Sequence, residues 1–337
     1  MAGVSRSTVS RVLNDEGHVR AEVRERVQDV ISRTGYTPNV AARSLVSNRT
    51  GVIGLVIPSR VHNLFEDPYF ARLIQGVTAA ANESHATLSL FLFQTEDEER
   101  ELFPRVVQSG FVDGVIITAT RMGDPVLARI AASELPVVMV GRPDLDGVSS
   151  VDVDNRGGAQ LAARHLIEQG YQRIGMIAPP ANTTAGVDRA EAFVAELAAH
   201  GRALRAELRA DGEFSEASGY DAMRQLAGLG DRRPDAVFVG SDSMAAGALR
   251  ALRELELRVP DDVAVVGFDG LAASEQTNPP LTTIRQPVGT TAARAVHLLD
   301  DLIRGTATPP VSEVIPVELV VRASSVRDRP DRPRRTP

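Results

Sequence analysis

Thr50-Gly-Val-Ile-Gly-Leu-Val-Ile-Pro58 decides the fold of this chain, together with a second stretch that resembles it, Gln172-Arg-Ile-Gly-Met-Ile-Ala-Pro179. Each stretch is a short apolar run that ends at a proline. Such runs are typical of a strand that is buried on both faces of a parallel sheet. The pair predicts two similar lobes, each of which begins with one of these strands.

Strand and helix patterns alternate after each of the two runs, as in a doubly wound parallel sheet. We expect further strands at residues 87–93, 114–118 and 136–140 in the first lobe, and at residues 173–177, 236–239 and 263–266 in the second. Helical patterns cover residues 71–82, 98–109, 124–132, 157–169, 188–200, 216–226, 243–255 and 288–303, and a strand-like run covers residues 314–321. The predicted class is therefore α/β.

The first fourteen residues have the pattern of the turn and second helix of a helix-turn-helix. Gly3 supplies the turn, Ser5 is a natural N-cap, and apolar residues recur at helical spacing at Val9, Val12 and Leu13. Arginine and hydroxyl side chains then point outward and suit a major groove, since arginine can bind guanine bidentately. An ordinary capped surface helix is the alternative interpretation. The outward residues are Arg6, Ser7, Ser10 and Arg11.

Two further helices are predicted before the first lobe. Residues 19–34 form an amphipathic pattern, and Gly35 fits its C-cap. Pro38 then begins a short helix at residues 39–46, which is too short to be stable alone in water and needs a partner to fold.

These motifs, taken together, resemble the lactose-repressor/galactose-repressor (LacI/GalR) family over nearly the whole chain. The resemblance rests on Thr8-Val-Ser-Arg-Val-Leu-Asn14, Tyr36-Thr-Pro-Asn39 and Ala42-Arg-Ser-Leu45. It extends to Arg233-Pro-Asp-Ala-Val-Phe-Val-Gly-Ser-Asp-Ser-Met-Ala-Ala-Gly247 and Val259-Pro-Asp-Asp-Val-Ala-Val-Val-Gly-Phe-Asp269. Family members carry a further helix before the first of these motifs, so we expect the first helix of the helix-turn-helix to be missing here.

The resemblance implies two sets of DNA-binding residues. In the first set, Arg6, Ser7 and Arg11 read the major groove, and the other DNA-binding candidates of this segment are Ser5, Thr8, Ser10 and Asn14. The set in the short hinge helix, which folds in the minor groove when two copies meet, comprises Asn39, Ala42, Arg43 and Leu45. Leu45 would wedge a base step, as inserted apolar side chains do in kinked duplexes. The alternative for Leu45 is a linker residue that packs against the core.

The resemblance also implies the domain organisation. We expect a truncated helix-turn-helix at residues 1–37, a hinge helix and linker at 38–49, and a periplasmic-binding-protein-like effector domain at 50–326. Within that domain, the N-lobe comprises about residues 50–152 plus 282–310, and the C-lobe about 153–281 plus 311–326. Residues 327–337 are rich in proline and arginine and predict a disordered tail without the leucine heptads of a tetramer, so a homodimer is expected.

Polar residues that follow the predicted strands mark the expected effector site, because ligands bind at the carboxyl ends of such sheets. The candidates that follow strands are Arg142, Asp154, Ser241 and Asp269. Arg189 joins them from a helix start, and Tyr69 and Phe70 are aromatic residues that flank the site. Planar polar groups suit sugar hydroxyls and aromatic rings stack on sugar faces, so a sugar is the favoured effector. By resemblance, Ser241 departs from an asparagine common among sugar binders.

Structural alternatives exist for several of these residues. Asp242 is interpreted as the N-cap of the helix at 243–255, and Asp154 has the same alternative for the helix at 157–169. Arg142 and Asp269 have the alternative of a salt bridge across the cleft.

Composition supports a DNA-binding regulator and gives little support to an enzyme. The net charge is −7, yet residues 1–50 hold eight arginines and five acids, a balance of +3. The chain has no cysteine and no lysine, and its six histidines do not cluster, so we expect no catalytic site, no cofactor and no metal site. No dinucleotide fingerprint or nucleophile elbow is present.

We therefore expect a cytoplasmic, dimeric transcriptional repressor that binds double-stranded operator DNA and has no membrane partner. A small-molecule effector, favoured to be a sugar, would close the cleft between the lobes and change the folding of the two hinge helices. The alternative is a sugar-binding protein that does not bind DNA and resembles a transport solute receptor, but no signal peptide precedes the first lobe.

Overall fold

The computed structural model describes residues 2–13, 17, 19–34, 49–57, 67–93, 95, 97, 98, 100, 101, 104, 110–118 and 120–327. The chain divides into two compact units, Met1–Thr50 and Gly51–Pro337. The predicted hinge helix lies outside the described residues, as do most of the predicted helix at 98–109 and the tail after Arg327. The DNA-binding candidates outside them are Asn14, Asn39, Ala42, Arg43 and Leu45.

The described part of the first unit contains two helices, α1 (Arg6–Leu13) and α2 (Ala21–Thr34). They pack on each other, and Val12 from α1 and Val27 from α2 are buried. Both helices were predicted from the apolar spacing. The second begins two residues later than the pattern indicated.

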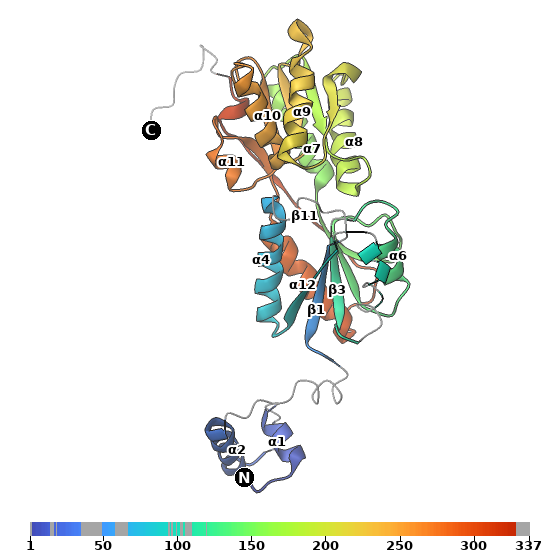
Figure 1. Cartoon of the computed structure of the whole chain (residues 1–337), viewed down its shortest axis with the longest axis vertical. Helices are drawn as coiled ribbons and strands as arrows, with labels where there is room; N and C mark the ends of the chain where they lie inside the picture. The colour runs from blue at the N-terminus through green and yellow to red at the C-terminus, as the bar shows by residue number, and fades with distance from the viewer. Residues whose placement is uncertain are drawn as a thin grey trace. The chain divides into compact units, whose positions relative to one another are not determined.

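The N-lobe is a six-stranded sheet in the order β11-β5-β4-β3-β1-β2, with all neighbours parallel. Its strands are β1 (Val52–Ile57), β2 (Thr87–Leu92), β3 (Gly114–Thr118), β4 (Val137–Val140), β5 (Ser149–Val153) and β11 (Ser312–Ile315). Its helices are α4 (Pro68–Glu83), α6 (Pro125–Ala131) and α12 (Val288–Arg304). Figure 1 shows this sheet with α4 and α12 beside it.

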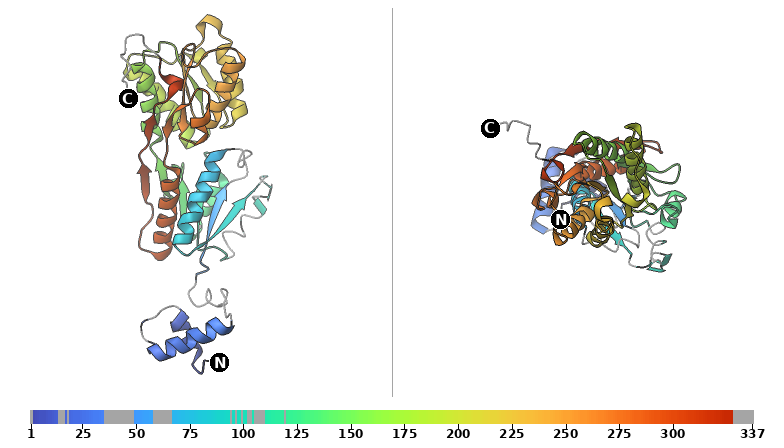
Figure 2. Two further views of the ribbon diagram at one scale, coloured as in Figure 1. Left: turned by 90° about the vertical axis from the view of Figure 1, so that its left-hand side faces the viewer. Right: turned by 90° about the horizontal axis from the view of Figure 1, so that it is seen from above.

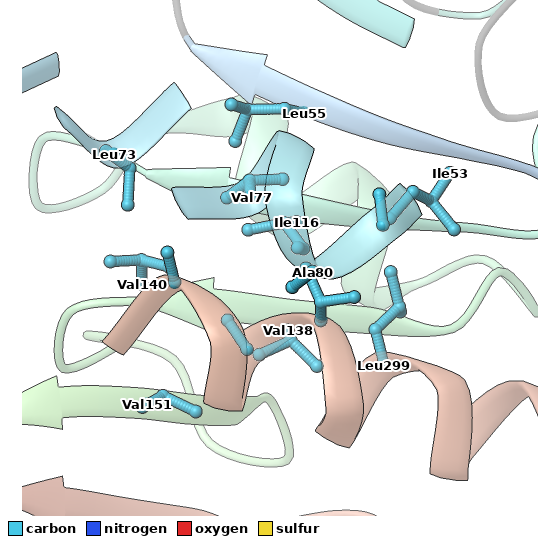
Figure 3. Close-up of a cluster of buried hydrophobic side chains, with 14 of the residues drawn as sticks. Ile53, Leu55, Leu73, Val77, Ala80, Ile116, Val138, Val140, Val151 and Leu299 are labelled. Atoms are coloured by element: carbon cyan, nitrogen blue, oxygen red, sulfur yellow. The ribbon is translucent and has the colours of Figure 1, made fainter. Parts of the chain in front are cut away.

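Successive side chains of β1 alternate between the two faces of the sheet, as the strand geometry requires. Ile53 and Leu55 pack under α4 and α12 in one core (Figure 3). Val56 points the other way and packs with residues of α6 in a second core. The unbroken apolar run of β1 thus reflects burial on both faces.

The C-lobe repeats this plan with the order β12-β10-β9-β8-β6-β7, in which only the β10–β12 pair is antiparallel. Its strands are β6 (Ile174–Ala178), β7 (Arg209–Asp211), β8 (Ala236–Val239), β9 (Ala264–Asp269), β10 (Thr282–Arg285) and β12 (Glu318–Val320). Helices α7 (Asn155–Glu168) and α8 (Thr184–Ala199) cover one face, and α9 (Glu216–Ala227) and α10 (Asp242–Glu254) cover the other. Short helices complete it: η1 (Ala206–Leu208), η2 (Gly230–Arg232), α11 (Ala273–Gln276) and η3 (Ala323–Ser325).

Helices α9 and α10 approach each other closely at two glycines. A Cβ atom on Gly247 would lie 1.9 Å from the carbonyl oxygen of Glu216, and one on Gly219 would lie 2.0 Å from that of Met244. No side chain fits at either position without separating the helices, so both glycines are required by packing.

The chain crosses between the lobes three times: from β5 to α7, from β10 to α12, and from β11 to β12. Figure 2 shows the last two crossings beside one another, in orange and red. Three crossovers agree with the arrangement that the family resemblance implied. The three crossing segments together form the hinge region between the lobes.

Two of the predicted lobe boundaries are wrong. Residues 282–285 were assigned to the N-lobe, but β10 pairs with β9 in the C-lobe sheet. Residues 312–315 were assigned to the C-lobe, but β11 pairs with β5 in the N-lobe sheet. The single strand predicted at 314–321 is in fact two strands in different sheets. Pro316 lies between them, where its missing N–H cannot contribute to a ladder.

The C-terminal part of the described chain is held against the C-lobe. The guanidinium of Arg327 lies 4.2 Å from the ring centroid of Tyr171, which is buried. Arg327 was predicted as the first residue of the tail and instead packs on the lobe.

Candidate functional site

The N-terminal face of α1 carries the hydroxyl groups that the sequence predicted. The N–H of Thr8 donates to Oγ of Ser5 at 3.2 Å, so Ser5 is the helix cap. The hydroxyls of Ser7 and Thr8 lie 2.8 and 2.9 Å from the same oxygen. Ser7 and Arg11 are exposed, and Arg6 and Ser10 lie in the same helix. Polar groups therefore gather at a helix start, where backbone N–H groups favour phosphate.

A cavity of about 380 Å³ lies between the two lobes, at the carboxyl ends of their strands. Thr118 ends β3, Val140 ends β4, Val153 ends β5 and Asp269 ends β9, and all four line the cavity. Its size falls in the range of small-molecule sites, roughly 300–1,000 Å³. The cavity thus lies where the strand ends predicted it. Tyr69, Phe70, Arg189 and Asp269 are the candidates that line it.

Arg189 is the best-anchored of these residues. It extends from α8, is buried, and lies with its guanidinium carbon 3.6 Å from the ring centroid of Phe268. Its Nε donates to Oδ1 of Asn155 at 2.8 Å, and its Nη1 donates to the carbonyl of Gly240 at 2.8 Å. Its Nη2 has no hydrogen bond to another described residue. One fixed donor nitrogen is therefore available to a ligand.

Asp269 links Arg189 to a buried polar network. Its Oδ1 accepts from Arg189 Nη1 at 3.3 Å and from Gln286 Nε2 at 2.7 Å, and its Oδ2 accepts from the N–H of Asp242 at 3.3 Å. Burial raises the pKa of Asp269 to about 6, although Arg189 lowers it. Its backbone φ of 121° is unusual for a residue with a side chain, and such strain is found at functional sites.

Aromatic rings supply the apolar part of the lining. Tyr69 and Phe70 contact each other edge to face, with ring centroids 5.4 Å apart. Phe214 also lines the cavity, and its φ of 58° places a bulky residue in the left-handed region. The sequence analysis did not identify Phe214, because no local pattern signals that conformation.

Three carboxylates and three amides of the lining were also missed. They are Asp67, Asp152, Glu213, Asn155, Asn182 and Gln286. Asp67 caps α4 by accepting from the N–H of Tyr69 at 3.0 Å. Asp152 was detectable, because it interrupts the apolar run of β5. Gln286 follows β10, a strand that the sequence analysis did not predict.

Three predicted effector residues do not line the cavity. Arg142 donates to Asp188 Oδ2 at 2.8 Å with a half-exposed side chain, so it does not pair with Asp269 either. Asp154 caps α7 by accepting from the N–H of Gly157 at 2.7 Å, as its structural alternative proposed. Ser241 caps α10 by accepting from the N–H of Met244 at 3.2 Å. Each of these three side chains therefore makes a hydrogen bond within the protein instead.

The cap of α10 was predicted one residue too late. Asp242 is the first residue of the helix, and its carboxylate instead accepts from the N–H of Leu271 at 2.8 Å and from the hydroxyl of Thr283 at 2.6 Å. Burial, and then the nearby Asp269 carboxylate, raise the pKa of Asp242 well above its usual value.

Polar contacts between the lobes enclose the cavity on two sides. On one side, Thr184 Oγ1 donates to the carbonyl of Arg142 at 2.7 Å, beside the Arg142–Asp188 pair. On the other side, Ser243 Oγ donates to Asp67 Oδ1 at 3.2 Å. These lobe-closing contacts hold the two lobes together around the ligand space.

The described residues contain no group of three histidine, cysteine or acidic side chains placed to hold a metal ion. Within the same part of the chain, no helix combines the length and apolar character needed to cross a membrane.

A helix-turn-helix-like unit followed by two α/β lobes around a cavity with aromatic and charged lining residues defines a class of ligand-controlled DNA-binding regulators. Residues 1–39 match the model of the bacterial regulatory proteins, lacI family, and residues 163–325 match a periplasmic binding protein-like domain. The HTH-type transcriptional regulator CelR of Thermobifida fusca is 39% identical over 329 residues, with 96% of each chain covered. The ribose operon repressor of Escherichia coli is 34% identical over 305 residues, with 89% of each covered.

Solved structures agree with this assignment. A complex of the transcriptional regulator CelR with cellobiose has a TM-score of 0.77 at 37% identity, over 96% of this chain and 97% of that one. The lac repressor dimer bound to operator and the anti-inducer ONPF has a TM-score of 0.83 at 27% identity, over 97% of each. The chain belongs to the lacI family of transcriptional regulators, which are DNA-binding proteins and not enzymes.

Proposed function

We propose that this protein is a homodimeric transcriptional repressor that binds operator DNA and is controlled by a sugar bound between its lobes. It has no catalytic activity of its own and acts in the cytoplasm, where the chromosome lies. Of the two functions weighed from the sequence, the match of residues 1–39 to the lacI family supports the repressor over a transport receptor.

The single observation that carries the proposal is the composition of the cavity. Arg189 and Asp269 offer donors and acceptors in fixed directions, which suit the paired hydroxyls of a sugar ring. Tyr69, Phe70 and Phe214 supply rings for its apolar faces. The cellobiose complex of the related CelR supports a disaccharide as the first ligand to test.

The switch uses the hinge between the lobes. A bound sugar that contacts both lobes stabilises the lobe-closing contacts, and closure changes the spacing of the two hinge segments in a dimer. Those segments, which include Asn39, Ala42, Arg43 and Leu45, then gain or lose the partner that they need to be helical in the minor groove. Ser5, Arg6, Ser7, Thr8, Ser10, Arg11 and Asn14 bind the major groove in this proposal.

A gel shift tests this function. The purified protein is titrated onto DNA that flanks its own gene at about 0.15 M salt, with and without cellobiose and a panel of other sugars. We expect specific binding, and a shift in apparent affinity with one sugar. Absence of specific binding would contradict the repressor assignment.

A further inference from the structure

The charges that line the cavity are unequal. Among the described lining residues, four carboxylates and two guanidiniums are present: Asp67, Asp152, Glu213, Asp269, Arg121 and Arg189. Arg189 is already matched by Asp269 at 3.3 Å. Arg121 is partly exposed and follows β3, and Glu213 is exposed. The described lining therefore carries two more carboxylates than guanidiniums, and Asp67 and Asp152 are more buried than Glu213.

Asp67 and Asp152 are held by neutral donors. Asp67 accepts from the N–H of Tyr69 at 3.0 Å and from the hydroxyl of Ser243 at 3.2 Å, both at Oδ1. Asp152 accepts from the side-chain amide of Asn155 at 3.1 and 3.3 Å and from the N–H of Val153 at 2.8 Å. No described cation lies within salt-bridge distance of either carboxylate. Within the described part of the chain, neither carboxylate therefore has a salt-bridge partner.

The electrostatics of the neighbouring groups agree with this geometry. Burial is the largest cause acting on Asp67 and Asp152 and raises the pKa of both, while the charge of Arg189 lowers both. Burial also raises the pKa of the Tyr69 hydroxyl; Asp269, Asp152 and Asp67 raise it further, while Arg189 lowers it. The hydroxyl of Tyr69 therefore lies in a field dominated by carboxylates. A second anion in this space meets repulsion, whereas a hydroxyl donor meets free acceptor oxygens, including Oδ2 of Asp67.

We propose that Asp67 and Asp152 act as a charge filter, which admits uncharged sugars to the cavity and rejects sugars that carry a carboxylate or phosphate group. This inference rests on the proposed function, because it concerns the effector of the same site. In this proposal, these two residues make the cavity bind a sugar more tightly than its acidic derivatives. A site built for an anion would instead present an excess of arginine.

Isothermal titration of the full chain tests the filter. The probes are cellobiose and the two derivatives in which one or the other hydroxymethyl group is oxidised to a carboxylate, since this change adds charge with little change in size. We expect at least one derivative to bind at least tenfold more weakly than cellobiose. In the Asp67→Asn, Asp152→Asn double variant, this ratio of affinities should fall toward one. Asn retains the acceptor oxygen that caps α4, and Asp146→Asn, an exposed change outside the cavity lining, is the matched control.

The outcomes separate this inference from the proposed function. If the parent protein binds cellobiose and both acids within threefold of one another, the filter is wrong and the sugar effector stands. A ratio that persists unchanged in the double variant also overturns the assignment to Asp67 and Asp152. If the parent protein binds neither cellobiose nor its acids, while a non-sugar compound shifts its operator affinity, then the sugar effector is wrong and the filter fails with it. The ratio of affinities measured in the parent protein decides whether the cavity discriminates against charged sugars, even if the double variant does not fold.

Discussion

We expect replacement of Arg189 with alanine to weaken effector binding while operator binding without effector stays nearly the same. Arg189 keeps one nitrogen without a described partner and holds its others on Asn155, Gly240 and Asp269. Loss of one hydrogen bond from a charged group to the ligand costs about 1.5–3 kcal/mol. That range corresponds to a roughly tenfold to more than hundredfold weaker effector affinity.

The same substitution also leaves the buried Asp269 carboxylate without its cation. The variant should therefore lose thermal stability, and should lose more at pH 8, where Asp269 is ionised, than at pH 5, where it is largely protonated. Arg156→Ala is the matched control, because Arg156 is exposed, pairs with Asp188 and Glu191, and does not line the cavity.

Calorimetric titration of the effector, gel shifts without effector and thermal melts at the two pH values measure these effects. We expect the operator affinity measured without effector to stay within about threefold of the parent value, because the substitution removes free energy of effector binding and not of DNA binding. Unchanged effector affinity in a folded Arg189→Ala variant would refute this account of the cavity. So would an equal loss in the Arg156→Ala control.

Three further predictions concern the hinge, the C-lobe and the effect of pH. Leu45→Ala should weaken operator binding at least tenfold in a gel shift while calorimetry gives nearly the same effector affinity; equal losses in both would contradict the proposed wedge. Gly247→Ala should lower stability by about 1–3 kcal/mol in denaturant unfolding, because its Cβ would overlap the Glu216 carbonyl, whereas Gly289→Ala in α12, which meets open space, should be neutral or slightly stabilising. Equal effects at the two glycines would argue against this packing. The folded-state pKa of Asp269, about 6, lies above its ordinary 3.8, so its protonated form favours the fold and this contribution is lost as pH rises from about 4 to 6. In thermal melts, the Asp269→Asn variant should therefore lose less stability than the parent between about pH 4 and pH 6. Parallel profiles of melting temperature against pH for the two proteins would contradict this prediction.

The apolar runs and helical periods predicted the lobes well because burial on both faces gives a strong, local signal. β3 and β8 match their predicted bounds, Gly114–Thr118 and Ala236–Val239. The lobe that each crossing strand joins was harder to predict, because it depends on pairing with strands that are distant in the sequence. Nothing in Thr282–Arg285 itself distinguishes pairing with β9 from pairing in the other sheet.

The sequence also identified some residues of the cavity lining correctly and placed others there wrongly. Asp269 was identifiable from its strand end and Arg189 from a predicted helix start, both with support from the family resemblance, and both line the cavity. Ser241 and Asp154 follow strands as well, but each is also the last residue before a helix, and capping uses their oxygens. Sequence position places a polar side chain near the crevice. Only the local backbone geometry decides whether it faces the ligand or the helix.

The coupling between the cavity and the DNA is the central claim, and one titration tests it most directly. The protein is titrated onto DNA flanking its own gene at about 0.15 M salt, with saturating effector and without it, in the parent and in Arg189→Ala. The account predicts that effector changes the apparent operator affinity of the parent by about 5- to 150-fold, the usual range of allosteric coupling, and changes that of the variant far less at the same concentration. An operator affinity that no cavity ligand alters in the parent would contradict the account.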